Sequence, residues 1–265
     1  MSPGLVDRRG LGWKRDPPLP FGAKPHPDAR LTLGTASPPE TGSGRQWVQS
    51  VLDQGQASTC VAHSIPQNVR MAHARAGIRD PQLMSRRMGY WYARGEDGTQ
   101  NVDEGTYLSS FFKALDQVGF CPESLCPYDI SKINQQPPAA AVRAAYDQRS
   151  PTVYQRITTA GQARVDDIKR AIAAGYGVSF GTLVTEDFCS NVLSDGPIPV
   201  PTADQQIAGG HALIGVEYDP RGVKGPNSWG ESWGDDGWFN FSWDYMVWDE
   251  TTDLWIVAQA PNYSE

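Results

Sequence analysis

One cysteine of this sequence stands where a helical pattern begins, six residues after a glutamine. The two residues are Cys60 and Gln54, in the stretch QGQASTCVA. The thiolate is the nucleophilic form of cysteine, and a helix N-terminus lowers the thiol pKa because its unpaired N–H groups favour negative charge. Cys60 is therefore a candidate nucleophile. An isolated cysteine is more often a small buried hydrophobe, so the rest of the sequence has to decide.

A histidine and an asparagine in the second half could serve such a nucleophile. His211 opens a predicted strand directly after Gly209 and Gly210, which leave its ring uncrowded and able to face a cleft. Asn227 follows sixteen residues later, at the end of another predicted strand, and its amide oxygen could hold the imidazole in one tautomer. A lone histidine is more often structural, and the Trp/Gly-rich segment after Asn227 could mark only a packed turn. The other histidines are His26 in a Pro-rich segment and His63 and His73 on the Cys60 helix, where their spacing keeps them from facing the thiol.

The helix that carries Cys60 is predicted from apolar residues at spacings near four. It runs to about Ala76, and Gly77 can end it. Ser58 or Thr59 can cap its start. Pro66 lies inside it and should kink the helix or displace its first turn.

The remaining elements divide the chain into a helical first half and a strand-rich second half. Further helices are predicted at 83–94, 106–118 and 165–174, and strands at 178–184, 212–218, 238–243 and 254–258. This order indicates an α+β fold with a cleft between the two layers. We expect one domain at 46–265, with its helical half at about 46–135 and its β-rich half at about 150–265.

Residues 1–45 are rich in proline and glycine and show neither a helical nor a strand period. Proline fixes the backbone φ angle and removes a hydrogen-bond donor, so this segment is predicted to be an extended N-terminal arm. Such an arm could lie on its own domain or on a neighbouring chain, and the sequence does not choose between them.

Composition excludes several classes of function. The formal net charge of −7 and the lack of a basic stripe argue against nucleic acid as the main partner. No apolar run is long enough to span a membrane, and the N-terminus lacks the apolar core of a secretory signal, so an intracellular or virion-associated location is expected. Four cysteines are too few for a disulfide scaffold, and the Cys/His spacings match no zinc motif, so neither a metal nor another cofactor is expected.

Taken together, the motifs resemble the papain family of cysteine peptidases, including its bacterial members. QGQASTC resembles the family's glutamine and nucleophile motif, GGHALIGVEY its histidine strand and NSWGESWGDDGWF its asparagine–tryptophan motif. His211 and Asn227 follow Cys60 by 151 and 167 residues, at and slightly beyond the usual range. The resemblance covers about residues 46–260. It implies a papain-like fold, with a helical subdomain and an antiparallel β-barrel-like subdomain on either side of an active-site cleft.

The resemblance also implies a mechanism and a role for each site residue. His211 takes the proton from Cys60, the thiolate attacks a peptide carbonyl, and a thioester forms and is hydrolysed. Gln54 and the backbone N–H of Cys60 stabilise the oxyanion, and Asn227 orients His211. Trp229 shields the His–Asn hydrogen bond, while Gly105 and Gly210 line the cleft where substrate backbone approaches. The paired thiolate predicts that Cys60 is alkylated before the other three cysteines.

Several positions depart from the family pattern. Ala57 stands where secreted relatives have a cysteine that forms a disulfide, and Val61 replaces a bulky aromatic residue after the nucleophile. The arm is too short and too Pro-rich to be the family's helical prosegment, which is therefore expected to be absent. Cys121 and Cys126 could pair or remain two free thiols.

Two further functions stay open at this point. The chain could be a papain-fold component of a larger assembly such as a phage particle, with catalysis secondary or lost. It could also hydrolyse non-protein amides, such as cell-wall peptides, with the same residues. The main expectation is a cysteine endopeptidase that acts on polypeptides.

Overall fold

The computed structural model describes residues 9–18, 33–147, 149, 152–191 and 196–259. The helices are α1 (Val61–Arg75), α2 (Arg86–Asp97), α3 (Leu108–Val118), α4 (Ala139–Asp147), α5 (Gly161–Ala173), α6 (Glu186–Cys189) and α7 (Trp243–Val247), with 3-10 turns η1 (Arg45–Trp47) and η2 (Ile130–Lys132). The strands are β1 (Trp13–Lys14), β2 (Gly42–Ser43), β3 (Thr106–Tyr107), β4 (Val153–Ile157), β5 (Val178–Thr185), β6 (Ile207–Gly215), β7 (Glu217–Asp219), β8 (Gly222–Pro226), β9 (Trp238–Ser242) and β10 (Thr252–Gln259).

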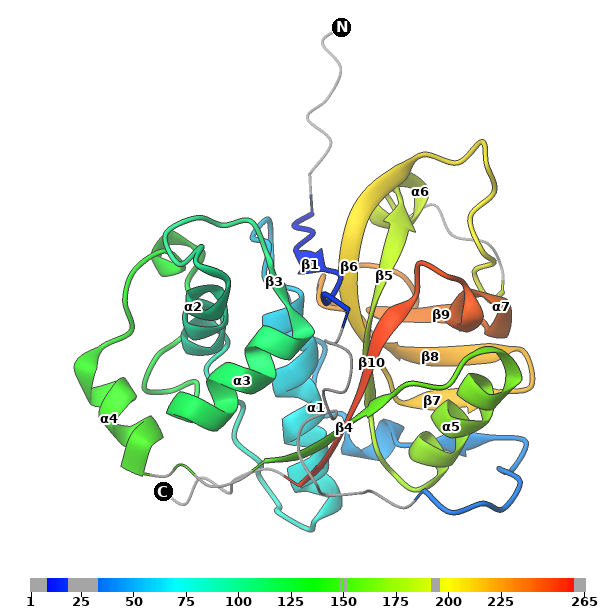
Figure 1. Ribbon diagram of the computed structural model, residues 1–265, viewed down its shortest axis with the longest axis horizontal. Helices are drawn as coiled ribbons and strands as arrows, with labels where there is room; N and C mark the ends of the chain where they lie inside the picture. Colours follow the sequence, from blue (N-terminus) through cyan, green and yellow to red (C-terminus); the bar gives the residue numbers. More distant parts are fainter. Residues whose placement is uncertain (1–8, 19–32, 148, 150–151, 192–195, 260–265) are drawn as a thin grey trace, which may run out of the picture.

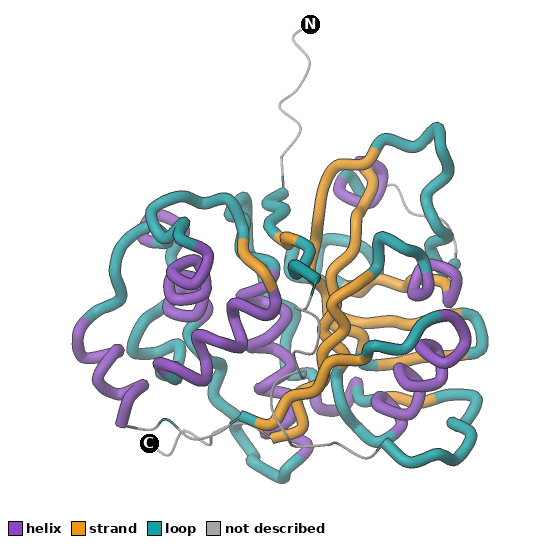
Figure 2. Tube along the Cα trace, in the orientation of Figure 1, coloured by secondary structure: helices purple, strands orange, loops and turns teal. Residues whose placement is uncertain are grey.

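The helices of the first half and the larger sheets lie on opposite sides of the molecule, with α5, α6 and α7 on the sheet side (Figure 1). Helices α2, α3 and α4 form one side, and the larger sheets form the other, as Figure 2 shows. Helix α1 lies between them and packs on α2 and α3 as well as on β5, β6 and β10. Most of its side chains are buried, from Val61 to His73, because it faces apolar neighbours on both sides. The α+β, papain-like arrangement expected from the sequence is confirmed.

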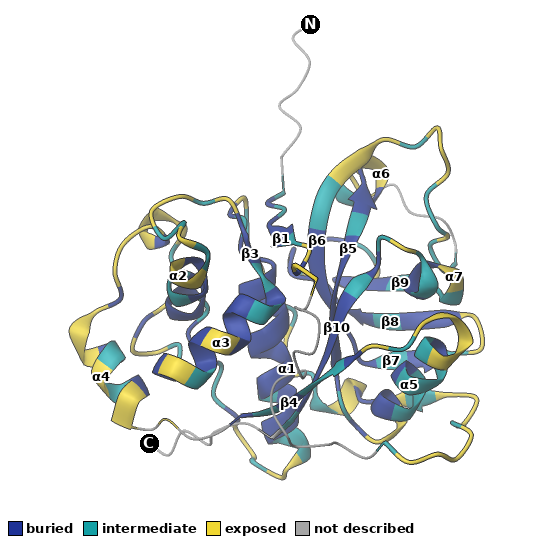
Figure 3. Ribbon diagram, viewed as in Figure 1, coloured by how far each residue is buried: buried dark blue, intermediate teal, exposed yellow. Residues whose placement is uncertain are grey.

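Two four-stranded antiparallel sheets make up the strand-rich side. Their orders are β4-β10-β5-β6 and β2-β7-β8-β9. In the first sheet His211 of β6 lies opposite Thr182 of β5, and Ala212 lies opposite Gly181. The inner parts of these strands are buried, as the dark ribbons in Figure 3 show. The sheet therefore holds His211 on a rigid, largely buried strand.

Most predicted elements are present with shifted ends, but the strand predicted at 212–218 is divided between β6 and β7, and His211 lies inside β6 rather than at its start. The helix predicted at 83–94 lies at Arg86–Asp97, the one at 106–118 lies at Leu108–Val118, and the one at 165–174 starts earlier, at Gly161. Gly77 and Gly175 follow their helices with φ of +90° and +85°, as expected of terminating glycines. No range was predicted for β1 to β4 or for α4, α6 and α7. None was predicted for β8 either, although Asn227 directly follows the end of a strand as expected.

The capping prediction for the Cys60 helix is wrong. Cys60 itself is the N-cap of α1, and no side chain caps it. The backbone N–H of Ser58 donates to Asp103, and the Thr59 hydroxyl is hydrogen-bonded to the Tyr128 hydroxyl. Because these partners lie far away in sequence, no local pattern could indicate them. Helix α1 is continuous through Pro66.

The described parts of the N-terminal arm lie on their own domain. Residues 9–18 enter between the two sides of the molecule, where β1 pairs in parallel with β3 and lies beside β6 (Figure 1). Further along, β2 pairs with β7. Other parts of the arm, 1–8 and 19–32, fall outside the described residues. The division at residue 45 and a contact with a neighbouring chain stay predictions.

Candidate active site

Cys60 is placed at the first turn of α1, as the sequence predicts. Its carbonyl accepts the first helical hydrogen bonds, from His63 N at 3.1 Å and Ser64 N at 2.9 Å. The thiol is fully buried, and backbone N–H groups of Ala212 and Gly12 point to it. Ala212 follows His211 directly in β6, so the structure brings the cysteine helix and the histidine strand into contact.

His211 and Asn227 are joined by a hydrogen bond. The Nε2 atom of His211 lies 2.8 Å from Oδ1 of Asn227, and its Nδ1 atom has no hydrogen-bond partner among the described residues. Because an amide oxygen can only accept, Nε2 carries the proton and Nδ1 is left as the basic atom. Trp229 stacks on the imidazole with ring centroids 4.4 Å apart and is itself buried. This arrangement fixes the tautomer and shields the His–Asn bond from water.

Gln54 is oriented by a chain of hydrogen bonds that ends at His211. Its Oε1 accepts from the Ser228 hydroxyl at 2.6 Å, and the Ser228 backbone N–H donates to Oδ1 of Asn227 at 2.7 Å. One N–H of its side-chain amide donates to Ala57 O at 2.8 Å. The four expected residues Gln54, Cys60, His211 and Asn227 thus meet between α1 and the sheets. The sequence analysis gave no role to Ser228, although it directly follows Asn227.

The arm occupies the surface around these residues. The second amide N–H of Gln54 donates to Gly10 O at 2.9 Å, and Gly10 N donates to Gly55 O at 3.2 Å. Gly12 O accepts from Thr106 N at 2.9 Å. The hydrogen-bond donor that an oxyanion would need is therefore taken by a carbonyl of the arm.

Glycines on both sides allow this close approach. A Cβ atom at Gly105 would lie 2.0 Å from Gly12 O, and one at Gly210 would lie 2.4 Å from Trp13 O. On the arm, a Cβ atom at Gly10 or Gly12 would lie 1.9 Å from the carbonyl oxygen of Ala57 or Ser58. Gly105 and Gly210 thus line the groove that holds the arm backbone, whereas Trp229 accepts a hydrogen bond from Arg9 of the arm through its backbone carbonyl.

A buried carboxyl pair anchors the end of this segment. The Asp16 backbone N–H donates to Asp253 at 2.8 Å, and the Asp16 carboxylate accepts from the N–H and hydroxyl of Ser109 at 3.1 and 2.8 Å. Arg156 pairs with Asp253 and lies 3.9 Å from Asp16. Burial, and secondarily the charge of Asp253, raises the pKa of Asp16 to about 6.

Under the arm, the cysteine and the histidine are held neutral. Burial raises the pKa of Cys60 to about 11 despite the surrounding N–H groups, and burial lowers the pKa of His211 to about 4 despite the bond to Asn227. The expected thiolate–imidazolium pair is therefore not the favoured state here. The sequence prediction assumed an open cleft and did not include desolvation by the arm.

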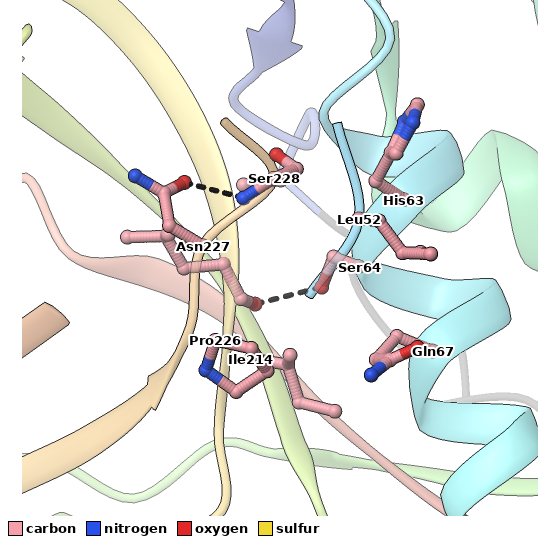
Figure 4. A pocket seen from close by; sticks show the side chains of 10 residues that line it. Leu52, His63, Ser64, Gln67, Ile214, Pro226, Asn227 and Ser228 are labelled. Carbon is pink, nitrogen blue, oxygen red and sulfur yellow. Dashed lines mark hydrogen bonds between the residues drawn. The ribbon is translucent and has the colours of Figure 1, made fainter. Parts of the chain in front are cut away.

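A small pocket lined by both polar and apolar residues lies behind the site, between α1 and strands β6 and β8 (Figure 4). Ser64 of α1 donates to Leu213 O across it at 2.7 Å, and Gln67, Asn227 and Ser228 also line it. It is distinct from the groove that holds the arm. Its polar contacts tie the cysteine helix to the histidine strand.

His63 also lies near the site, but its ring is fully engaged. Its Nδ1 is 2.8 Å from Thr59 O, and its Nε2 is 3.0 Å from the Arg86 guanidinium. Burial, followed by the charge of Arg86, lowers its pKa to about 3. His63 is therefore a neutral structural residue in α1.

Two other observations concern the described part of the chain. No group of three or more His, Cys, Asp or Glu side chains there could hold a metal ion, and none of its helices is long and apolar enough to cross a membrane. All four cysteines are free, including Cys121 and Cys126, whose pairing the sequence left open.

Comparison with known proteins identifies the family. The family described as papain family cysteine protease matches residues 39–249, and the chain belongs to it. An uncharacterized peptidase C1-like protein of Acanthamoeba polyphaga mimivirus is 31% identical over 222 residues, which cover 80% of this chain and 70% of the relative. The chain is therefore a peptidase of the papain family, as the sequence motifs predicted.

Solved structures share the fold. Xylellain, a cysteine protease from Xylella fastidiosa, has a TM-score of 0.79 at 23% identity and covers 96% of this chain and 97% of its own. The bromelain protease from Ananas comosus in complex with the E64 inhibitor has a TM-score of 0.63 at 16% identity. The match covers 84% of this chain and 100% of the bromelain chain. Procathepsin B S9 from Trypanosoma congolense has a TM-score of 0.69 at 14% identity. The match covers 98% of this chain and 88% of the procathepsin chain.

Proposed function

We propose that this protein is a cysteine endopeptidase in which Cys60 is the nucleophile and His211 is its base. The observation that carries the proposal is the hydrogen bond from His211 Nε2 to Asn227, which leaves Nδ1 as an unpartnered, basic nitrogen on a strand that packs against the cysteine helix. A buried imidazole nitrogen without a partner is costly unless it has a function. Proton transfer from the Cys60 thiol gives it one.

The reaction follows from the positions of these groups. Once water and substrate replace the arm, the dipole of α1 and the nearby N–H groups favour the thiolate, and Asn227 favours the imidazolium. The thiolate attacks the peptide carbonyl carbon, and the oxyanion takes the place that Gly10 O holds on Gln54, with the Cys60 N–H as second donor. His211 gives its proton to the leaving amine. Water then hydrolyses the thioester, with His211 as base.

The arm cannot itself be cleaved in the position seen here. The Cys60 thiol faces the backbone N–H of Gly12, whereas the carbonyl held by Gln54 belongs to Gly10. No carbonyl carbon is thus both next to the thiol and bound to the oxyanion donor. We infer that the docked arm lowers the activity of the peptidase, so that only the fraction of protein with a displaced arm cleaves peptides.

The test of the catalytic assignment compares three full-length proteins. Wild type, Cys60→Ala and His211→Ala are incubated with a peptide library and the products are identified by mass spectrometry. Loss of all cleavage in both variants is expected. Turnover by Cys60→Ala at the wild-type rate would show that the nucleophile is another residue.

Peptides are the substrate class that the family of cysteine proteases favours. No observation on this chain supports the alternative of a papain-fold structural component. Hydrolysis of cell-wall peptides would use the same residues and would be detected in the same assay by adding such a peptide to the library.

A further inference from the structure

The loop that carries both proposed oxyanion donors is held by a largely buried polar cluster. The loop runs from Gln54 to Cys60, and its donors are the Gln54 side-chain amide and the Cys60 backbone N–H. None of the side chains in the cluster takes part in the proposed reaction. They come from α1, from α2 and from the chain that follows α3, and they are His63, Arg86, Glu123 and Tyr128.

The Tyr128 hydroxyl joins the two ends of this loop. It donates to the Gln54 carbonyl oxygen at 2.9 Å, and the Thr59 hydroxyl lies 2.7 Å from it. Because the Tyr128 hydroxyl has a single proton and a carbonyl can only accept, the Thr59 hydroxyl is the donor of the second bond. Gln54 and Thr59 are both fully buried. Tyr128 thus fixes the spacing between the residue that carries one donor and the residue that precedes the other.

His63 acts on the second donor from the far end of the same peptide group. Its Nδ1 lies 2.8 Å from the Thr59 carbonyl oxygen, which can only accept, so Nδ1 carries the proton. The described residues contain no cis peptide bond, and in a trans peptide the C=O and N–H bonds point in opposite directions. The bond to Thr59 O therefore fixes the direction of the Cys60 N–H. It also polarises this peptide group, which strengthens the N–H as a donor.

Arg86 and Glu123 keep His63 in this tautomer. The Arg86 guanidinium lies 3.0 Å from His63 Nε2, which has no proton and accepts this bond. Arg86 is held in turn by Glu123 at 2.7 Å, and Glu123 also accepts from the Tyr128 backbone N–H at 2.9 Å. The His63 ring meets the Tyr128 ring edge-on, with centroids 4.8 Å apart. Burial and the charge of Arg86 lower the pKa of His63 to about 3, so the ring stays a neutral donor at Nδ1.

We propose that His63 and Tyr128 are positioning residues of the oxyanion hole: Tyr128 sets the place of Gln54, and His63 sets the direction of the Cys60 N–H. The inference rests on the proposed peptidase function and adds two residues to the same site. Both act through Gln54 and Thr59 rather than on the substrate. They should therefore support attack on a carbonyl but not a reaction of the Cys60 thiolate that forms no oxyanion.

The experiment compares two reactions of Cys60 in each full-length protein. Peptide hydrolysis develops an oxyanion, whereas alkylation by iodoacetamide forms a C–S bond at a saturated carbon, releases iodide and develops none. Both reactions need the thiolate and a displaced arm. The ratio of kcat/KM for hydrolysis to the alkylation rate constant is therefore independent of the fraction of open protein. A misplaced oxyanion donor lowers this ratio, whereas a general loss of active protein does not.

Two substitutions remove one hydrogen-bonding group each and keep a ring in place. Tyr128→Phe and His63→Phe should each lower the ratio about tenfold, through kcat with little change in KM, because a misplaced donor loses part of the hundredfold or more that a donor contributes. His63→Asn returns an amide N–H near the position of Nδ1 and should restore most of the ratio. The matched controls are Tyr146→Phe at an exposed tyrosine and His73→Phe in the last turn of α1, and both should keep the wild-type ratio.

The outcomes separate the two proposals. A wild-type ratio in Tyr128→Phe or in His63→Phe would overturn the role of that residue, even where both reactions become slower. An equal fall in His63→Asn and His63→Phe would assign the effect to packing of the ring and overturn the role of its N–H. If the wild type cleaves no peptide although iodoacetamide labels Cys60, the proposed function fails and the positioning roles fail with it. Circular dichroism of each variant checks that the fold is retained.

Discussion

Substitution of Gly12 by alanine should release the arm and activate the enzyme. The added Cβ atom would lie 1.9 Å from the Ser58 carbonyl oxygen, which is backbone and cannot move aside. A Cβ atom and a carbonyl oxygen that are not bonded to each other lie at least about 3 Å apart, so the arm has to shift by at least about 1 Å at this point. Gly12 lies at the centre of the docked segment, and a shift there disturbs its neighbours as well.

The magnitude follows from the hydrogen bonds that such a shift breaks. They are Gln54 Nε2 to Gly10 O, Gly10 N to Gly55 O and Thr106 N to Gly12 O, at 2.9, 3.2 and 2.9 Å. At about 1 kcal/mol each, their loss weakens docking by about 3 kcal/mol. This is about a hundredfold change in the ratio of covered to open protein. A rise in kcat/KM of up to about a hundredfold is expected.

Two assays measure this change independently. Peptide hydrolysis reports catalysis, and the rate of Cys60 alkylation by iodoacetamide, followed by mass spectrometry, reports exposure of the thiol. Both should increase in Gly12→Ala and remain at the wild-type level in Gly196→Ala, a control variant whose added Cβ atom would meet no described atom within 4 Å. A folded Gly12→Ala protein with unchanged hydrolysis and unchanged alkylation would refute the idea that the arm covers the active site in solution.

Three further predictions concern the supporting residues. Asn227→Ala should lower kcat by about ten- to a hundredfold in the Gly12→Ala background, because His211 loses the acceptor that fixes its tautomer; an unchanged kcat would exclude this role. Ser228→Ala should lower kcat about tenfold with little change in KM, since Gln54 loses the hydroxyl that orients it as oxyanion donor; an effect on KM alone would argue against that role. Docking of the arm should depend on pH through Asp16, whose pKa is raised from 3.8 to about 6 in the docked state. Such a carboxyl supports docking fully below about pH 4 and loses this support as the pH rises through about 6, so the ratio of wild-type to Gly12→Ala kcat/KM should rise across that window. Asp16→Asn cannot ionise and should make the ratio independent of pH; persistence of the rise would assign it to another group.

The sequence was sufficient for the catalytic residues because their signals are local. Cys60 follows a loop and starts an apolar helical period. His211 follows two glycines and precedes an apolar run, although β6 itself begins earlier, at Ile207. Asn227 comes with a distinctive Trp/Gly segment. No range was predicted for strand β8 because Gly222, Gly225 and Pro226 are typical of a turn. The strand forms nevertheless because it pairs with β7 on one side and β9 on the other, which the local sequence does not show.

The position of the arm could not be predicted from local patterns. Its contacts join residues far apart in sequence, such as Asp16 with Asp253, which are 237 residues apart. Proline and glycine content correctly indicated an extended segment, but the groove that receives it is built from glycines in β5, β6 and the loop before β3. In the sequence, each of these glycines can be explained by a turn or a strand of its own. Only the folded structure shows that all of them face the same segment of the arm.

The glycines of this groove separate changes in the site from changes in the arm. Gly105 and Gly210 admit the backbone of the arm, and Gly181 admits the ring of Trp13. A larger residue at any of these three positions would alter the wall of the groove as well as displace the arm, whereas a change at Gly10 or Gly12 affects the arm alone. The ratio of covered to open protein is thus adjustable through the arm without altering the site.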